Sequence, residues 1–183
     1  MSGKGRSLVL GVHSADPVLS TVAAIGLAAI TPACLIVDLA GDLRMPAGRN
    51  LGSLLVDGPR LDELSPGRRG VALLAGGGVE MAEAERAIAD LTARWPALVV
   101  RSDRGSWVGP SVPVVPLYPG LLSPTDERSA VWQPAGSADK PPGPGPVLPR
   151  LRPGLTRRLL AGQLPRRSRW MAAWRDVWDM PWA

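Results

Sequence analysis

The stretch from residue 7 to residue 42 constrains the fold of this 183-residue chain more than any other part of it. It reads SLVLGVHSADPVLSTVAAIGLAAITPACLIVDLAGD, and its first aliphatic run ends at Gly11. Asp16 and Pro17 suit the N-cap and the first position of a helix, which the apolar residues 18–30 would continue. A second apolar run, closed by Asp38, follows this helix. The order of strand, loop, helix and strand predicts the opening βαβ unit of a nucleotide-binding fold.

The same stretch also meets the length criterion for a membrane-spanning helix, because residues 17–37 carry no charge over 21 positions. Gly26 and Pro32 interrupt the run, however, and neither end has a basic cluster that would set an orientation. A helix and a strand buried in a parallel α/β sheet would produce the same run. We therefore favour the α/β interpretation and keep the spanning helix as its alternative.

Helix and strand patterns continue to alternate up to residue 117. The apolar residues 71–74 lead into a glycine turn, residues 80–95 form an amphipathic helix stopped by Pro96, and residues 97–100 form another strand. Residues 112–117 contain two prolines and read at best as an edge strand. This order predicts an α/β domain over residues 1–117, with a mostly parallel sheet of four to five strands flanked by helices, of the Rossmann-like P-loop type.

The composition changes after this domain. Residues 118–153 are rich in proline without an apolar period, which predicts an extended linker in preference to a docking motif for a proline-reading module. Residues 154–183 are predicted to form a basic, Trp-rich helical tail. The eight arginines from residue 150 onward outnumber two aspartates, so the basic pI of about 10.6 belongs to this end of the chain.

Four tryptophans recur at every fourth position of the tail and would lie on one side of a helix. An aromatic stripe of this size rarely stays in water. Three interpretations stay open: the helix packs onto the domain as a cap, docks to a partner protein, or lies at a membrane surface, where Trp and Arg suit the headgroup region. The residues expected to bind a partner or membrane are Trp170, Trp174, Trp178, Trp182, Arg166, Arg167 and Arg169.

The loop after the first strand lacks the residues that phosphate chemistry requires. A working phosphate loop needs glycines whose N–H groups close on the phosphates, a Lys that reaches them, and a Ser or Thr hydroxyl for Mg²⁺. Here only Gly11, Ser20 and Thr21 are of the right type, and the Lys position holds Leu19 or Ser20. Asp16 adds a negative charge where phosphate would sit. We therefore expect triphosphate binding to be absent or very weak, with no cofactor, no metal site and no catalytic residue.

The order of these segments resembles the ParA/MinD superfamily of partitioning and positioning ATPases, which includes members tied to pilus assembly. The resemblance rests on the GVH loop, Ser20-Thr21, the apolar helix, LIVDLAGDL, NLGSLLVDG and VALLAGGG, and covers about residues 5–117. The signature Lys residues, the loop glycines and the second half of the family's sheet are missing. The resemblance implies a truncated, degenerate, catalytically inactive member. Its vestigial nucleotide-binding positions would be Gly11, His13, Ser20, Thr21 and Asp38, where Asp38 matches the Asp that helps handle the attacking water and Mg²⁺.

Other chemistry is weakly represented in the sequence. His13 is the only His, so a catalytic triad would have to use it with the adjacent Ser14 and Asp16, an alternative that stays open in principle. Cys34 is the only Cys and cannot form an intramolecular disulfide, which makes the cytoplasm the default location. The segment RSDRG at 101–105 reads as a charged turn.

The sequence favours a non-catalytic adaptor or positioning subunit of a bacterial secretion, pilus, conjugation or partitioning assembly. Its partner would be an intact ATPase of the same system or a second copy of the chain, and the tail would hold it at that partner or on the inner face of the membrane. Two alternatives stay open: a weak nucleotide-binding enzyme, and a nucleic-acid-binding module that uses the Arg and Trp residues of the tail.

Overall fold

The computed structural model describes residues 8–41, 49–58, 60, 70–120, 129–136, 140–165 and 167–182. In chain order these residues form β1 (Leu8–His13), α1 (Pro17–Ala29), β2 (Ala33–Asp38), α2 (Leu51–Asp57), β3 (Gly70–Ala75), α4 (Met81–Thr92), β4 (Ala97–Arg101), β5 (Ser111–Leu117), β6 (Val131–Pro134), α5 (Pro153–Leu160) and α6 (Arg169–Trp178).

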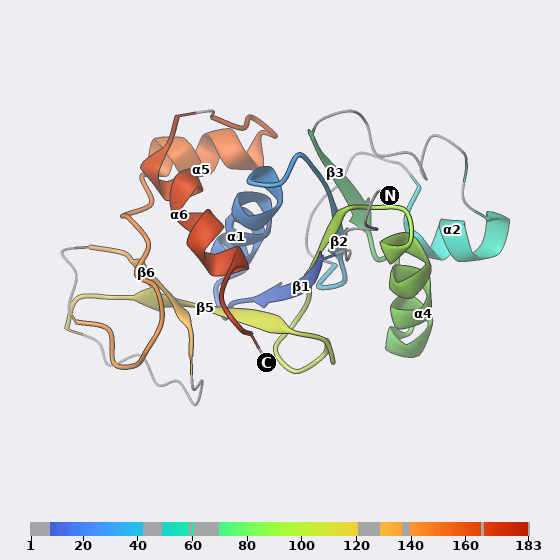
Figure 1. Cartoon of the computed structure of the whole chain (residues 1–183), viewed down its shortest axis with the longest axis horizontal. Helices are drawn as coiled ribbons and strands as arrows, with labels where there is room; N and C mark the ends of the chain where they lie inside the picture. Colours follow the sequence, from blue (N-terminus) through green and yellow to red (C-terminus); the bar gives the residue numbers. More distant parts are fainter. Residues whose placement is uncertain are drawn as a thin grey trace, which may run out of the picture.

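All of these strands pair in parallel in one sheet with the order β3-β2-β4-β1-β5-β6 (Figure 1). The predicted parallel α/β fold is therefore confirmed. The expected number of four to five strands was wrong, because the described residues form six. The additional strand, β6, lies inside the segment predicted as a proline-rich linker. Its four residues, VWQP, are too few to produce a recognisable pattern among the surrounding prolines.

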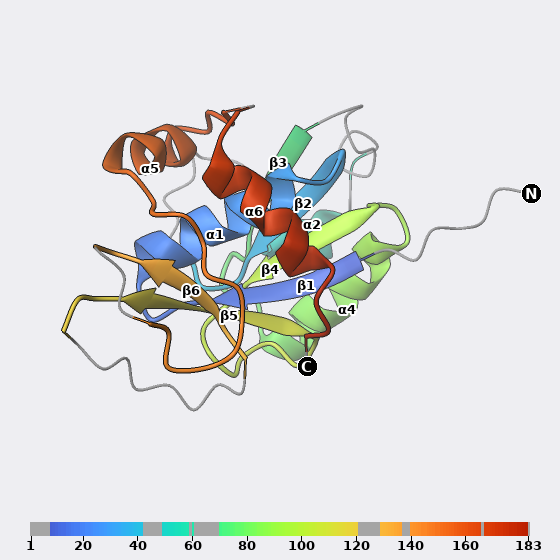
Figure 2. The ribbon, with the colours of Figure 1, turned by 60° about the vertical axis from the view of Figure 1, so that its left-hand side comes forward.

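Helices cover both faces of the sheet, and each face has its own apolar core. Helices α1, α5 and α6 lie on one face, where the larger core cluster also includes Ile36, Val99 and Val114. Helices α2 and α4 lie on the other face, where Leu51, Ile88 and Leu91 pack against Leu35 and Val37. Figure 2 shows this three-layer arrangement from the side of α5 and α6. Alternate residues of the central strands serve opposite faces, which explains why these strands read as continuous apolar runs.

The first βαβ unit accounts for the long uncharged run of residues 17–37. Asp16 caps α1 by accepting a hydrogen bond from Leu19 N, and Pro17 occupies the first turn, as the sequence predicts. Every residue of β2 is buried. The spanning-helix alternative is therefore wrong for this run, since it divides into a helix and a strand. Within the described ranges, no helix combines the length and apolar character needed to cross a bilayer.

The C-terminal helix α6 packs on α1 (Figure 2). The contact is close because a small residue of α1 faces a large one of α6: a Cβ added to Gly26 would collide with the indole of Trp174. Trp178 Nε1 also donates a 2.8 Å hydrogen bond to Leu27 O, and the rings of Trp170 and Trp174 meet edge to face with centroids 5.3 Å apart. Of the three interpretations of the Trp stripe, packing onto the domain is the one that the structure shows.

Candidate functional site

The residues expected to be vestiges of a nucleotide site lie near the carboxyl ends of β1 and β2 and in the first two turns of α1. In open parallel α/β sheets, ligands bind outside this edge. Gly11 and His13 lie in the last half of β1, Ser20 and Thr21 in α1, and Asp38 at the end of β2. The described structure brings Ser20 and Asp38 together through a third residue, Arg101, the last residue of β4.

Arg101 is the central side chain of this site. Its guanidinium Nη1 lies 2.6 Å from Asp38 Oδ1, and its Nε donates a 3.2 Å hydrogen bond to Ser20 Oγ. Both charged side chains are 1% exposed, so the ion pair is dry. The register explains this contact, because Asp38 and Arg101 are Cα partners of neighbouring strands and point to the α1 face. The pair therefore joins β2, β4 and α1 at the carboxyl ends of the strands, where a nucleotide would bind.

The sequence-based interpretation of RSDRG as a charged turn was wrong for its first residue. Arg101 is 1% exposed and belongs to β4. A usable signal was nevertheless present: an Arg ends one buried apolar strand and an Asp ends another. Parallel strands place such ends at one edge of the sheet, so the two opposite charges could have been expected to meet.

The N-terminus of α1 is occupied by its own capping residue. Asp16 Oδ1 accepts a 3.0 Å hydrogen bond from Leu19 N, and the hydroxyl of Thr21 donates to Pro17 O at 2.8 Å. A carboxylate stabilises the partial positive charge of a helix N-terminus, but it also repels an anionic ligand from the same place. One N–H group and the Thr hydroxyl that a phosphate or Mg²⁺ would use therefore have partners within the helix itself.

The indole of Trp107 covers Gly11 of β1. A Cβ added to Gly11 would lie 2.5 Å from Trp107 Cδ1 and 3.1 Å from Ser111 Oγ. Gly11 is therefore needed for the close approach of Trp107, so this glycine has a packing role that is independent of any phosphate loop. Trp107 belongs to the segment between β4 and β5 and packs against the α2 and α4 face.

The residues present do not fit a nucleotide with Mg²⁺. A metal ion bound by Asp38, directly or through water, would share this carboxylate with the guanidinium of Arg101. The positive charge of the guanidinium would repel the metal ion. Asp38 Oδ2 is buried and has no hydrogen-bond partner among the described residues, yet the pair leaves only this one oxygen. Within the same part of the chain, no group of three or more His, Cys, Asp or Glu side chains could hold a metal ion.

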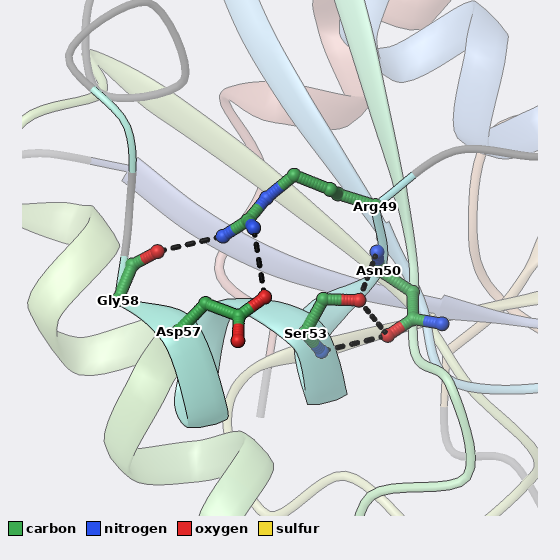
Figure 3. Close-up of polar contacts among 5 residues, drawn as sticks. All are labelled: Arg49, Asn50, Ser53, Asp57 and Gly58. Carbon is green, nitrogen blue, oxygen red and sulfur yellow. Dashed lines mark hydrogen bonds and ion pairs between the residues drawn. The ribbon is translucent and has the colours of Figure 1, made fainter.

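A second polar cluster fixes the start of α2 (Figure 3). Asn50 Oδ1 accepts from Ser53 N at 2.9 Å, and Asn50 N donates to Ser53 Oγ at 3.3 Å, which is a reciprocal capping box. Arg49 Nη1 and Nη2 reach Asp57 Oδ2 at 3.0 Å and Gly58 O at 2.6 Å. These bonds join both ends of one short helix. The cluster is therefore explained by helix stability, without a ligand.

An apolar groove lies between α2 and α4, away from Arg101. Its cavity volume is about 400 Å³, and Leu51, Leu54 and Leu91 line it together with Asp90 and Arg94. Residues of this kind can receive apolar side chains, but they offer a nucleotide no cluster of N–H donors or cations. The groove is thus separate from the site around Arg101.

The tail residues expected to bind a partner or membrane divide into buried and exposed groups. Trp170 and Trp174 are 2% and 0% exposed, while Trp178 and Trp182 pack half-buried against the same core. Trp170 Nε1 also donates a 2.6 Å hydrogen bond to Gln133 Oε1. Arg167 and Arg169 are exposed, and Arg166 lies outside the described residues. Among the described members of this set, Arg167 and Arg169 are therefore the fully exposed ones.

No protein-family model matches the sequence, and no curated protein matches it. The structure resembles that of a ParA family ATPase from Chlorobium tepidum TLS, with a TM-score of 0.65 and 12% identity over 97% of this chain and 99% of the other. It also resembles a chain of the MinC:MinD cell division protein complex of Aquifex aeolicus, with a TM-score of 0.62 and 12% identity over 95% and 97% of the two chains. The fold is therefore ParA/MinD-like, and the likeness extends beyond residues 5–117 to the C-terminal helices.

Proposed function

We propose that this ParA/MinD-like fold serves as a non-catalytic adaptor or positioning subunit of a bacterial secretion, pilus, conjugation or partitioning assembly. The observation that carries the proposal is the buried ion pair between Arg101 and Asp38, which also takes the hydroxyl of Ser20. An ATPase needs an acid and a hydroxyl at this place that are free to act on Mg²⁺ and water. Here Asp38 and Ser20 both bond to Arg101 instead, which joins β2 and β4 to α1.

The electrostatics of the α1 terminus support the same conclusion. Asp16 places a carboxylate at the helix N-terminus, and the Lys position of a phosphate loop holds Leu19 or Ser20, which are 5% and 3% exposed. A triphosphate carries several negative charges and would meet this carboxylate first. Without a compensating cation the electrostatic free energy of binding is unfavourable.

A docking role requires a surface, and the exposed arginines of the C-terminal region supply one. Seven described arginines there are exposed, accompanied by the exposed acids Asp176 and Asp179; they are Arg150, Arg152, Arg157, Arg158, Arg167, Arg169 and Arg175. The tryptophans of α6 face the domain, so the opposite side of this helix and the outer side of α5 carry the charge. A partner that binds there would present an acidic surface, and complementary charges would speed its association.

The partner proposed is an intact ATPase of the same system, in the cytoplasm or at the inner face of the membrane. One of the solved structures with this fold is a complex of two proteins, MinC and MinD, which supports the idea that such a fold can be a docking unit. Anionic lipid and nucleic acid are the other surfaces that would attract the same arginines.

The decisive experiment is a calorimetric titration of the purified chain with ATP and Mg²⁺. The expected result is no measurable heat of binding for the natural protein. An Asp16→Asn variant keeps the helix cap while removing its charge, so it tests whether the carboxylate alone excludes phosphate. Micromolar binding by the natural protein would contradict the proposal, because the site would then hold nucleotide despite the ion pair.

The docking half is tested separately by binding of the candidate ATPase at several salt concentrations. Arg157→Glu with Arg158→Glu should weaken binding at least tenfold and reduce its salt dependence. The matched control reverses two exposed arginines on the opposite layer, Arg86 and Arg94 of the α4 region, and should leave binding unchanged. Binding to vesicles that contain phosphatidylglycerol, or to DNA, in place of the ATPase would contradict the choice of partner.

A further inference from the structure

The two edges of the sheet differ in how their backbone groups are satisfied. At the β6 edge, Ala130 N donates to Pro144 O at 3.2 Å and Trp132 N donates to Pro146 O at 2.9 Å. Leu148 N in turn donates to Trp132 O at 2.8 Å. The segment around residues 144–148 therefore covers this edge, and its prolines lack the N–H groups that would attract a further strand.

The opposite edge is strand β3, which pairs with β2 alone. Gly70 N donates to Pro32 O and Gly76 N donates to Asp38 O, so even-numbered residues of β3 direct their backbone groups to β2. In a parallel strand the N–H and C=O of one residue point to the same side and alternate along the chain. The groups of Val71, Leu73 and Ala75 therefore point away from the sheet, and no hydrogen bond within the described part of the chain reaches them.

Among the described residues, strand β3 has none of the features that normally protect a sheet edge. Its sequence, GVALLA, contains no charge and no proline. Native edges are commonly blocked by Lys, Pro, bulges or covering segments. Instead, β3 has apolar side chains on both faces, each partly exposed: Val71 and Leu73 pack against the α1 core, and Ala72 and Leu74 against the α4 core.

We propose that β3 is a docking edge for β3 of a second copy of this chain, paired antiparallel about a two-fold axis at Leu73. In this register Leu73 faces its own counterpart and Val71 faces Ala75, so all three outward residues find hydrogen-bond partners. The axis is perpendicular to the sheet, which keeps the α1 layers of both copies on one face. Two six-stranded sheets thereby become one continuous sheet.

A second copy satisfies the chemical requirements of this edge. The side chains of an added strand would lie beside the partly exposed apolar side chains of β3 on both faces, so they should be apolar on both faces. Strand β3 has this property itself, and an isologous contact needs only one such strand per subunit. Main-chain hydrogen bonds would supply the affinity, as in other cases of strand addition. This inference does not rest on the adaptor role, because neither Asp38 nor Arg101 takes part in it.

Sedimentation equilibrium of the full chain gives the first test. The expected mass rises with concentration from 19.3 kDa toward twice that value. Cross-linking then fixes the register, in a Cys34→Ala background. Residues that face each other in a hydrogen-bonded antiparallel pair have Cα atoms about 5.5 Å apart, within the range of a disulfide. A Leu73→Cys variant should therefore form a covalent dimer under mild oxidation.

The matched control is Val71→Cys, whose two copies would lie about 13 Å apart in the proposed register and should not cross-link. Amide exchange adds a measurement on the natural chain: Leu73 N–H should become protected as concentration rises, whereas Leu74 N–H should be protected throughout. A chain that stays at 19.3 kDa at high concentration would overturn the proposal, as would a dimer that cross-links through Val71→Cys and not through Leu73→Cys. In the first case the edge would be left for a strand of another protein.

Discussion

Arg101 and Asp38 end neighbouring parallel strands and form a buried ion pair, with Nη1 2.6 Å from Oδ1. The same guanidinium donates to Ser20 Oγ in α1. Two strands and a helix that meet at the ligand-binding edge of this fold are thereby held by one side chain. This contact between β2, β4 and α1 is the main support for the proposal that the fold is non-catalytic.

Removal of one partner of this pair should destabilise the protein strongly. Arg101→Leu leaves the carboxylate of Asp38 buried without its cation, which costs about 3–5 kcal/mol for pairs of this kind. The double variant Arg101→Leu with Asp38→Leu should recover most of that loss, because no buried charge remains. Urea unfolding of the three proteins measures both effects. Arg94→Leu, at an exposed position, is the control, and a single-variant cost as small as the control's would contradict the structural role.

The contact between α1 and α6 predicts an asymmetric response to alanine at two helical glycines. Gly26→Ala would drive a Cβ into the Trp174 indole and should destabilise the protein by about 1–3 kcal/mol. Gly154→Ala in α5 meets nothing within 4 Å and should be neutral or slightly stabilising. Thermal unfolding followed by Trp fluorescence compares the two variants. Equal melting temperatures would mean that α6 does not pack on Gly26 in solution.

The sequence indicated the central strands and α1 well because their physical signals are local. A capping Asp16 before Pro17 and a fully apolar run such as β2 depend only on neighbouring residues. These features account for the correct expectation of a parallel α/β fold.

The remaining features depend on contacts between distant residues, which the pattern of one segment does not reveal. Strand β6 is only four residues long and is recognised through its pairing with β5. The sequence places Trp174 in an aromatic stripe but does not show what the stripe packs against, which is Gly26, 148 positions earlier in the chain. Arg101 likewise reads as a turn residue until Asp38 of β2 lies beside it.

The hydrogen bond between Trp170 and Gln133 should couple α6 to strand β6. Trp170→Phe removes the Nε1 donor that lies 2.6 Å from Gln133 Oε1 and leaves that oxygen buried without its donor, at a cost of about 1–3 kcal/mol in addition to lost packing. Combining it with Gln133→Leu should give a non-additive free energy of unfolding, measured as a double-mutant cycle. Trp182→Phe removes a comparable donor to Val177 O at a half-buried site and is the control. Strict additivity would rule out the coupling.

Burial of Cys34 predicts a stability that falls at alkaline pH. Desolvation raises the pKa of the Cys34 thiol from its ordinary value of 9.0 to about 12, an effect only partly offset by hydrogen bonds from Thr31 and from the backbone of Val99. Below pH 9 the thiol is protonated in both states and contributes no pH dependence. Between pH 9 and 12 the unfolded chain loses the proton first, so the free energy of unfolding should fall by about 1.4 kcal/mol per pH unit from this group.

Because other groups titrate in the same range, the measurement is the difference in slope between the natural protein and Cys34→Ala in urea unfolding at several pH values. The natural protein should show the steeper decline, and its thiol should react with a disulfide reagent at pH 8 only after unfolding. Identical slopes, or rapid reaction of the folded protein, would mean that β2 does not bury this side chain.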